Sequence, residues 1–175
     1  MLTEHVHIMS LLGTAEEIVG RKKFQKVVYI GKQLGMPFHE KYGFHMYGPY
    51  SEELTIRLDE LKQFGFIRET HEECSGYSQY RYELAESGRE YLTKTTRSWT
   101  CHDEKVVVDE LNACTSKFLE LMATILYLQP ASKEEVIERV ATLKKTQNYS
   151  LADIDEAYAL IDHWKQSIAK ATLTH

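Results

Sequence analysis

The sequence predicts a mainly α-helical protein with a small β-hairpin. Two observations carry this prediction. The stretch from Arg21 to Glu83 has the order helix, aromatic turn, helix and two-stranded ribbon, and after His102 the apolar residues recur at the steps of three and four that are typical of helices. The first order is that of a winged helix-turn-helix domain. The second predicts a C-terminal helical extension.

The N-terminal part contains two predicted helices joined by a loop. Leu2 to Leu12 has the spacing of a short helix. Thr14 to Glu17 could form a capping box, but Gly20 favours a loop that leads to the next helix at Arg21. Gly35, followed by a proline, ends that second helix. Its apolar residues share one face: Phe24, Val27, Val28, Gly31 and Leu34.

An aromatic connection joins this helix to the next one. It contains Tyr42, Phe44, Tyr47 and Tyr50, and a Gly-Pro turn lies within it. These rings could form a stacking platform for bases or a peptide groove, but we expect them to fill the space between the helix and the wing. The next helix begins after its N-cap, Ser51, and buries three leucines before Gly65 ends it: Leu54, Leu58 and Leu61.

A hairpin and a short helix complete the predicted winged domain. Phe66-Ile67 enters the first strand, and Ser75-Gly76 is the turn. Tyr80, Tyr82 and Leu84 alternate on the return strand. Ala85 to Lys94 then has a helical spacing and is expected to lie against the wing.

The polar segment from Thr95 to Thr100 is the predicted linker between a winged-helix domain at 1–95 and an extension at 101–175. The extension is predicted to be a three-helix unit packed on the winged domain. Its first helix runs unbroken from Val107 to near Gln129, a capping box at Ser132 opens the second, and Ser150 caps the third.

Three segments show a resemblance to a known family. They read GRKKFQKVVYIGKQLG from Gly20, YGFHMYGPYSEELTIRLDELKQFGFI from Tyr42 and GYSQYRYELAESGREYL from Gly76. They resemble the YwgA family of small bacterial proteins, and the resemblance extends to LELMATILYL at Leu119 to Leu128. The core from Arg21 to Leu61 is also distantly similar to Panacea-domain antitoxins, through its Gln-Lys-x-x-Tyr helix and its Gly-Pro turn. Both resemblances bear on the fold, and neither implies an activity.

Composition and charge narrow the class of protein. The 175 residues carry a net charge of −5, which is too small for an acidic mimic of nucleic acid and opposite in sign to a typical DNA binder. The sequence contains no apolar run that could cross a bilayer and no signal peptide. Its three cysteines are widely spaced, so we predict a reduced, cytoplasmic protein without a disulfide framework or a zinc site.

No motif for catalysis is present. His39, Glu40 and His45 do not have the spacing of a zinc protease, and we interpret the histidines as structural. Cys74 lies beside two glutamates, which would raise its pKa, and Cys114 lies on an apolar face. We therefore predict a protein that is not an enzyme and needs no cofactor or metal.

The predicted binding surface is a basic cluster at the start of the second helix, on its exposed side, together with the aromatic turn. Basic side chains and a helix N-terminus both attract phosphate. The next helix, however, has four carboxylates against two cations, which disfavours DNA. The candidate residues are Arg21, Lys22, Lys23, Lys26, Tyr47, Tyr50 and Ser51.

These observations favour a non-catalytic winged-helix regulatory or interaction protein that acts by contact with another macromolecule. The alternative is a DNA-binding transcriptional regulator. The helix after His102 is apolar around much of its surface, and we expect a partner to cover part of it. Because two-fold dimers are the commonest assembly, the expected partner is a second copy of the chain.

Overall fold

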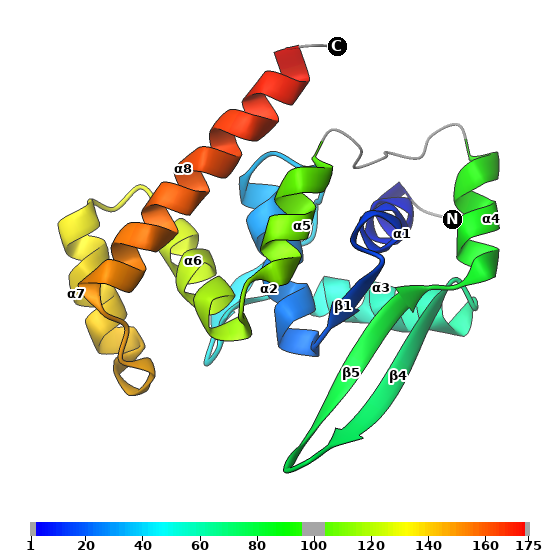
Figure 1. Ribbon diagram of the computed structural model, residues 1–175, viewed down its shortest axis with the longest axis horizontal. Helices are drawn as coiled ribbons and strands as arrows, with labels where there is room; N and C mark the ends of the chain where they lie inside the picture. The colour runs from blue at the N-terminus through cyan, green and yellow to red at the C-terminus, as the bar shows by residue number, and fades with distance from the viewer. Residues whose placement is uncertain (1–2, 96–103, 174–175) are drawn as a thin grey trace.

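The computed structural model describes residues 3–95 and 104–173. The protein is mainly helical with small antiparallel sheets, as predicted (Figure 1). Its helices are α1 Thr3–Ala15, α2 Arg21–Gln33, α3 Glu52–Gln63, α4 Glu86–Lys94, α5 Lys105–Ala113, α6 Ser116–Leu128, α7 Lys133–Leu143 and α8 Leu151–Leu173, with a 3-10 turn η1 Lys145–Gln147. Its strands are β1 Glu17–Val19, β2 Gly43–His45, β3 Gly48–Tyr50, β4 Ile67–Cys74 and β5 Tyr77–Leu84. Among the described helices, none combines the length and apolarity needed to cross a membrane.

Strands β1, β5 and β4 form one antiparallel sheet in that order. The predicted hairpin is confirmed: β4 and β5 pair from Ile67–Leu84 to Cys74–Tyr77, and the ribbon projects from the body of the molecule (Figure 1). The expected loop before α2 is wrong, because β1 occupies it and pairs Ile18 with Tyr82. A three-residue strand has too short a pattern to predict, and its pairing partner lies more than sixty residues away.

The aromatic connection folds into a second hairpin that was not predicted. Strands β2 and β3 pair Gly43 with Tyr50 and His45 with Gly48, where Gly48 has a φ of 83°. This hairpin packs on α2 and α6, rather than between a helix and the wing. Tyr42, which precedes it, donates a hydrogen bond to the carbonyl of Gln25 on α2 at 3.3 Å.

The single long helix predicted after His102 is two helices, so the extension contains α5, α6, α7 and α8. The chain is extended at Cys114 and Thr115, with ψ values of 148° and 151°. The Thr115 hydroxyl then accepts a hydrogen bond from the amide of Phe118 at 3.2 Å and caps α6. The apolar spacing continues across this break, which explains the wrong prediction. The capping box at Ser132 is confirmed.

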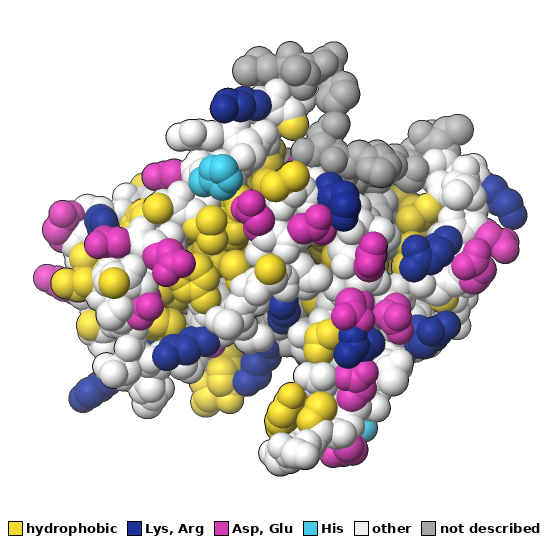
Figure 2. Space-filling view, in the orientation of Figure 1, with side chains coloured by type: hydrophobic (Ala, Val, Ile, Leu, Met, Phe, Trp, Pro, Cys, Tyr) yellow, Lys and Arg dark blue, Asp and Glu magenta, His cyan; other side chains and the backbone are white. Residues whose placement is uncertain are grey.

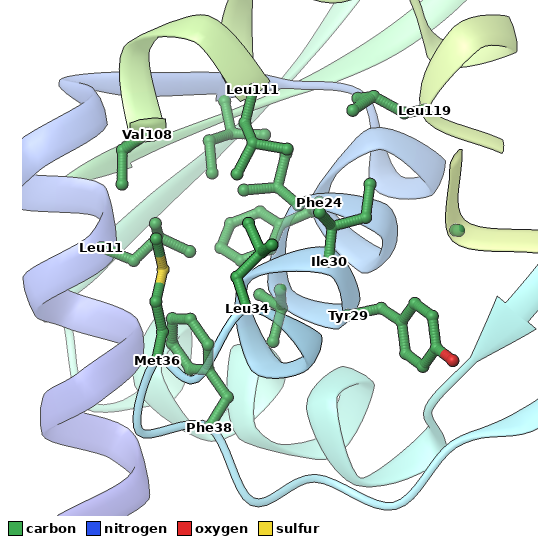
Figure 3. Packing of buried hydrophobic residues seen from close by; sticks show 14 of the residues in the cluster. Leu11, Phe24, Tyr29, Ile30, Leu34, Met36, Phe38, Val108, Leu111 and Leu119 are labelled. Carbon is green, nitrogen blue, oxygen red and sulfur yellow. The ribbon is translucent and has the colours of Figure 1, made fainter. Parts of the chain in front are cut away.

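The two halves of the chain share one hydrophobic core, in which α2 lies against α6 and α1 against α5. Figure 3 shows Leu11 of α1, Phe24 of α2 and Leu111 of α5 pointing toward the same interior. Three of the side chains that suggested a dimer are covered within this core: Val108, Leu121 and Leu126 are 0%, 0% and 6% exposed, whereas Val106 is 66% exposed. The homodimer stays a prediction. Most of the predicted linker, from residue 96 onward, lies outside the described residues, as do Cys101 and His102.

Candidate functional site

The four basic residues at the start of α2 do not form one exposed patch. Successive helical residues point in different directions, so each side chain meets a different neighbour. Arg21 and Lys22 are exposed, Lys23 is half-buried and Lys26 is only 3% exposed. The prediction that all four lie on the exposed side is wrong for Lys26, which reaches into the interior below the β2–β3 hairpin.

Arg21 and Lys23 are engaged within the fold. The Arg21 guanidinium lies 3.7 Å from the centroid of the Tyr80 ring, and its Nε donates to the Tyr82 hydroxyl at 3.2 Å. The Lys23 ammonium donates to the carbonyl of Asn112 at the end of α5. Burial lowers the pKa of Lys23. These two residues connect α2 to the wing and to the helical extension, which is a structural role.

Lys22 lies at the rim of the hairpin, where its Nζ is 3.2 Å from the centroid of the Tyr47 ring. A cation over an aromatic face is attracted by the electron density of that face. Tyr47 is 44% exposed and its neighbour Met46 is 81% exposed, so the hairpin tip presents apolar surface to solvent. Lys22 and Tyr47 are therefore a contacting pair of predicted residues that is accessible to a ligand.

A buried lysine cluster, formed by Lys26, Glu120 and Lys144, supports this hairpin from below. Lys26 Nζ donates to the Pro49 carbonyl at 2.7 Å, and Lys144 Nζ donates to the Met46 carbonyl at 2.9 Å. Lys144 Nζ also lies 2.7 Å from Glu120 Oε1. Two ammonium groups, one of them paired with Glu120, thus hold the two sides of the hairpin turn.

The electrostatics of the cluster are set by burial and by like charge. Burial lowers the pKa of Lys26 to about 8; Glu120 opposes this shift, while Lys144 and Lys22 add to it. The predictions from sequence missed Glu120 and Lys144. A signal existed for Glu120, because a carboxylate inside the apolar run of α6 is rarely buried without a partner. Lys144 carries no such signal.

A cavity of about 540 Å³ lies between α2, the β2–β3 hairpin, α3 and the wing. It brings together five of the predicted residues: Arg21, Lys22, Lys26, Tyr47 and Tyr50. Leu58, Met46 and Tyr82 add apolar and aromatic wall. The volume is within the range of roughly 300–1,000 Å³ that is usual for small-molecule sites.

Ser51 is near the cavity but has a structural role. Its hydroxyl accepts from the Leu54 amide at 3.1 Å and caps α3, as predicted. The Gln25 side chain brackets its backbone, donating to the Ser51 carbonyl at 2.9 Å and accepting from the Ser51 amide at 2.8 Å. At the cavity wall, Tyr50 and Thr55 share a hydrogen bond of 2.9 Å between their hydroxyls. These bonds fix α3 relative to α2.

The candidate catalytic residues do not converge. Glu40 is buried against Arg57 at 2.8 Å, His39 is exposed, and His45 lies over the Tyr50 ring at 5.0 Å between centroids. Among the described residues, no three histidine, cysteine or acidic side chains are placed to hold a metal ion. Cys74 and Cys114 are free thiols, and burial raises the pKa of Cys114.

A second hollow, of about 620 Å³, lies beside β1 and α4. Its walls are polar and include Glu16, Glu17, Glu83 and Arg89. None of the predicted site residues lines it, and its glutamates are not among any group that could hold a metal in the described part of the chain.

The outward face of α3, defined by Glu52, Ile56, Asp59 and Gln63, is exposed along the whole helix. Ile56 is 57% exposed. The two cations of α3 are both paired, Arg57 with Glu40, and Lys62 with Asp59 of this face and with Glu69 of β4. On the face shown in Figure 2, acidic and basic side chains are interspersed.

Comparison with known proteins gives one relative that spans the chain. It is the uncharacterized protein YwgA of Bacillus subtilis (strain 168), which is 45% identical over 166 residues, covering 95% of this chain and 99% of the relative. No protein-family model matches the chain. The identity and the coverage agree with the three sequence segments that predicted the family, and the chain belongs to the YwgA family.

Proposed function

We propose that the protein is a winged-helix regulatory module that works without catalysis, by binding another protein. The winged-helix assignment is supported by the order of α1, β1, α2, α3, β4 and β5, into which the β2–β3 hairpin is inserted between α2 and α3. It is also supported by the pairing of β1 beside β5 and by the projecting hairpin directly after α3. In this fold α3 is the helix that would read DNA. The similarity of Arg21 to Leu61 to Panacea-domain antitoxins stays a prediction.

The outward face of α3 is the observation that supports protein over DNA as the partner. A helix that reads the major groove presents Arg, Lys, Asn or Gln to the base edges. All of α3 is described, and its outward face presents Glu52 and Asp59 around an exposed Ile56. Gln63 is its one side chain of a base-reading type, and Asp59 is paired with Lys62 at 3.0 Å. Carboxylates repel the phosphate backbone, whereas an apolar side chain within a polar rim is typical of a protein interface.

Site-specific photocrosslinking tests this proposal. A photoreactive residue at Gln63 is expected to give discrete protein adducts in cell lysate that survive DNase. The substitution Ile56→Glu should remove these adducts, because it places a charge in the apolar centre of the interface. The matched control position is Glu138, which is exposed on α7 at the other end of the molecule from α4 (Figure 1). Equal adducts from Gln63 in the presence and absence of Ile56→Glu would contradict the proposal.

The alternative is a DNA-binding transcriptional regulator, favoured by the wing and by two exposed cations beside it, Lys22 and Arg68. If it is correct, the protein should retard a defined duplex at nanomolar concentration and physiological salt. The affinity should then fall steeply with salt, since phosphate contacts release counterions. Such retardation, lost on Lys22→Glu, would replace the protein-binding proposal.

A further inference from the structure

The cavity has two ends with different charge balance. At the wing end, the carboxylates of Asp59 and Glu69 are matched by cations: Lys62 Nζ lies 3.0 Å from Asp59 and 3.1 Å from Glu69, and Arg21 lies 3.5 Å from Glu69. Two carboxylates thus face two cations there. This end offers no unbalanced charge to a ligand.

At the hairpin end the cations are in excess. Three lysines, Lys22, Lys26 and Lys144, lie near one carboxylate there, that of Glu120, which is bound to Lys144 at 2.7 Å. The charged groups that act on Lys26 are Glu120, Lys144 and Lys22. Lys26 uses one N–H on the Pro49 carbonyl at 2.7 Å and lines the cavity. Because Lys26 and Lys144 are both buried beside the one buried carboxylate of Glu120, positive charge is in excess in the interior; such an excess is costly, and an anion would relieve it.

The rest of the cavity wall combines apolar and aromatic side chains with the polar Gln25, His45 and Thr55. Tyr50 and Tyr82 present rings to it, and Leu58 closes it from α3. The hairpin that forms the outer wall is held at two carbonyls by Lys26 and Lys144, so the cavity exists before any ligand binds. A preformed apolar cavity with positive charge at one end favours a ligand that has an apolar body and an anionic group at one end.

The geometry points to a binding site for a small organic oxyanion, an aromatic carboxylate or an aromatic phosphate ester, with its anionic group at Lys22 and Lys26 and its planar body against Tyr50, Tyr82 and Leu58. This site borders the outward face of α3 at Asp59 but does not include Ile56, the centre of that face. A ligand here would contact both α2 and α3, and it would therefore be placed to act as an effector of a partner bound to α3.

The first probe is 8-anilinonaphthalene-1-sulfonate, which combines a planar body with an oxyanion and reports binding by fluorescence. Saturable binding of one molecule per chain is expected. Its neutral counterpart, N-phenyl-1-naphthylamine, lacks the sulfonate and should bind at least roughly ten-fold more weakly, which is about 1.4 kcal/mol. Equal binding of the two probes, or no saturable binding of the sulfonate, would overturn the proposal.

Two competitors with the same naphthalene body identify the natural anionic group. Displacement of the probe by 2-naphthoate assigns a carboxylate, and displacement by 2-naphthyl phosphate assigns a phosphate. Displacement by neither compound would overturn the proposal.

Substitution of a lysine at the anionic end tests whether the probe binds in this cavity. Lys22 is exposed, so Lys22→Glu should leave the fold intact while it reverses one charge at the anionic end. The probe is expected to bind at least roughly ten-fold more weakly to this variant, because the substitution replaces an attraction at short range in a partly buried site by a repulsion. The matched control is Lys165→Glu on the exposed side of α8, which should not change binding. An unchanged affinity in Lys22→Glu would overturn the proposal, whatever the crosslinking from α3 shows.

Discussion

Lys26 is a buried cation, and its burial lowers the free energy of unfolding as long as the amine is protonated. The residue is 3% exposed, and burial lowers the pKa of its amine to about 8, whereas the lysines of an unfolded chain have a pKa of about 10.4. Between these values the unfolded state binds more protons than the folded state, so the free energy of unfolding rises with pH. The amine is better tolerated in the fold once it has lost its proton.

We predict that the free energy of unfolding of the wild type rises between pH 8.0 and pH 9.5, relative to Lys26→Met, by about 1.5 kcal/mol. Urea unfolding at the two pH values measures it. The range stops below pH 10 because burial raises the pKa of Tyr29 and of Tyr82, and tyrosine ionisation in the unfolded chain then lowers stability. Lys165→Met is the control and should follow the wild type. An identical pH dependence in Lys26→Met and the wild type would mean that Lys26 is not the titrating group.

At the scale of single elements, α4 depends on one glycine. A Cβ on Gly88 would lie 2.3 Å from the Phe66 carbonyl oxygen and 2.7 Å from Leu84 Cδ1. The carbonyl belongs to the backbone just before β4, so it cannot rotate away. The close approach of α4 to the sheet therefore requires glycine at this position.

Gly88→Ala is expected to destabilise the protein by about 3 kcal/mol, because overpacking forces the helix away from the sheet. The matched control is Gly13→Ala, also inside a helix, whose added Cβ would meet Leu84 at an ordinary 3.4 Å. This control should be neutral or stabilising by up to about 1 kcal/mol through helix propensity. Urea unfolding compares the two variants; equal stabilities would show that α4 does not pack as described.

The elements differ in how well the sequence predicts them, and the reason is the range of the interactions. The β4–β5 hairpin and the cap of α3 at Ser51 depend on neighbouring residues, and both were predicted. Strand β1 depends on β5, and the break between α5 and α6 depends on the cap at Thr115 inside a continuous apolar pattern. Long-range pairing and a single cap are not visible in periodicity.

The range of the interactions also decides how well the sequence predicts the candidate site. Lys22, Tyr47 and Tyr50 were predicted and line the cavity. Lys26 was predicted as a site residue but placed on the wrong side of α2, because its helix position does not reveal the hairpin and α6 packed above it. Lys144 was missed since its partner Met46 is 98 residues away in the chain.

At the scale of the whole molecule, the two halves are connected by polar bonds as well as by the core. Lys23 of α2 donates to the Asn112 carbonyl, and the Asn112 side chain donates to the Glu17 carbonyl of β1 at 2.7 Å. Contacts between α2 and α6 and between α1 and α5 join residues before and after the predicted linker. The core therefore belongs to both halves.

We predict one cooperative unfolding transition for the whole chain. Leu111→Ala, fully buried on α5, should cost about 3 kcal/mol. Amide hydrogen exchange should show the same loss of protection in the most protected amides of β5 and of α8. Loss confined to α8, or proteolytic release of a folded fragment that ends near residue 95, would mean that the halves unfold separately.

The hydrogen bond from Lys144 to the Met46 carbonyl joins the two halves of the chain, and it therefore limits how this protein can be divided during evolution. The hairpin that walls the cavity comes from the first half of the chain, while the ammonium that holds its turn, and the Glu120 that balances it, come from the second. A gene fusion or a truncation that kept only the first half would retain helices α1 to α4. It would lose Lys144 and Glu120, and with them part of the support of the hairpin that forms the outer wall of the cavity. We therefore expect the two halves to be inherited together, and a search for homologues that share this cavity should require both halves.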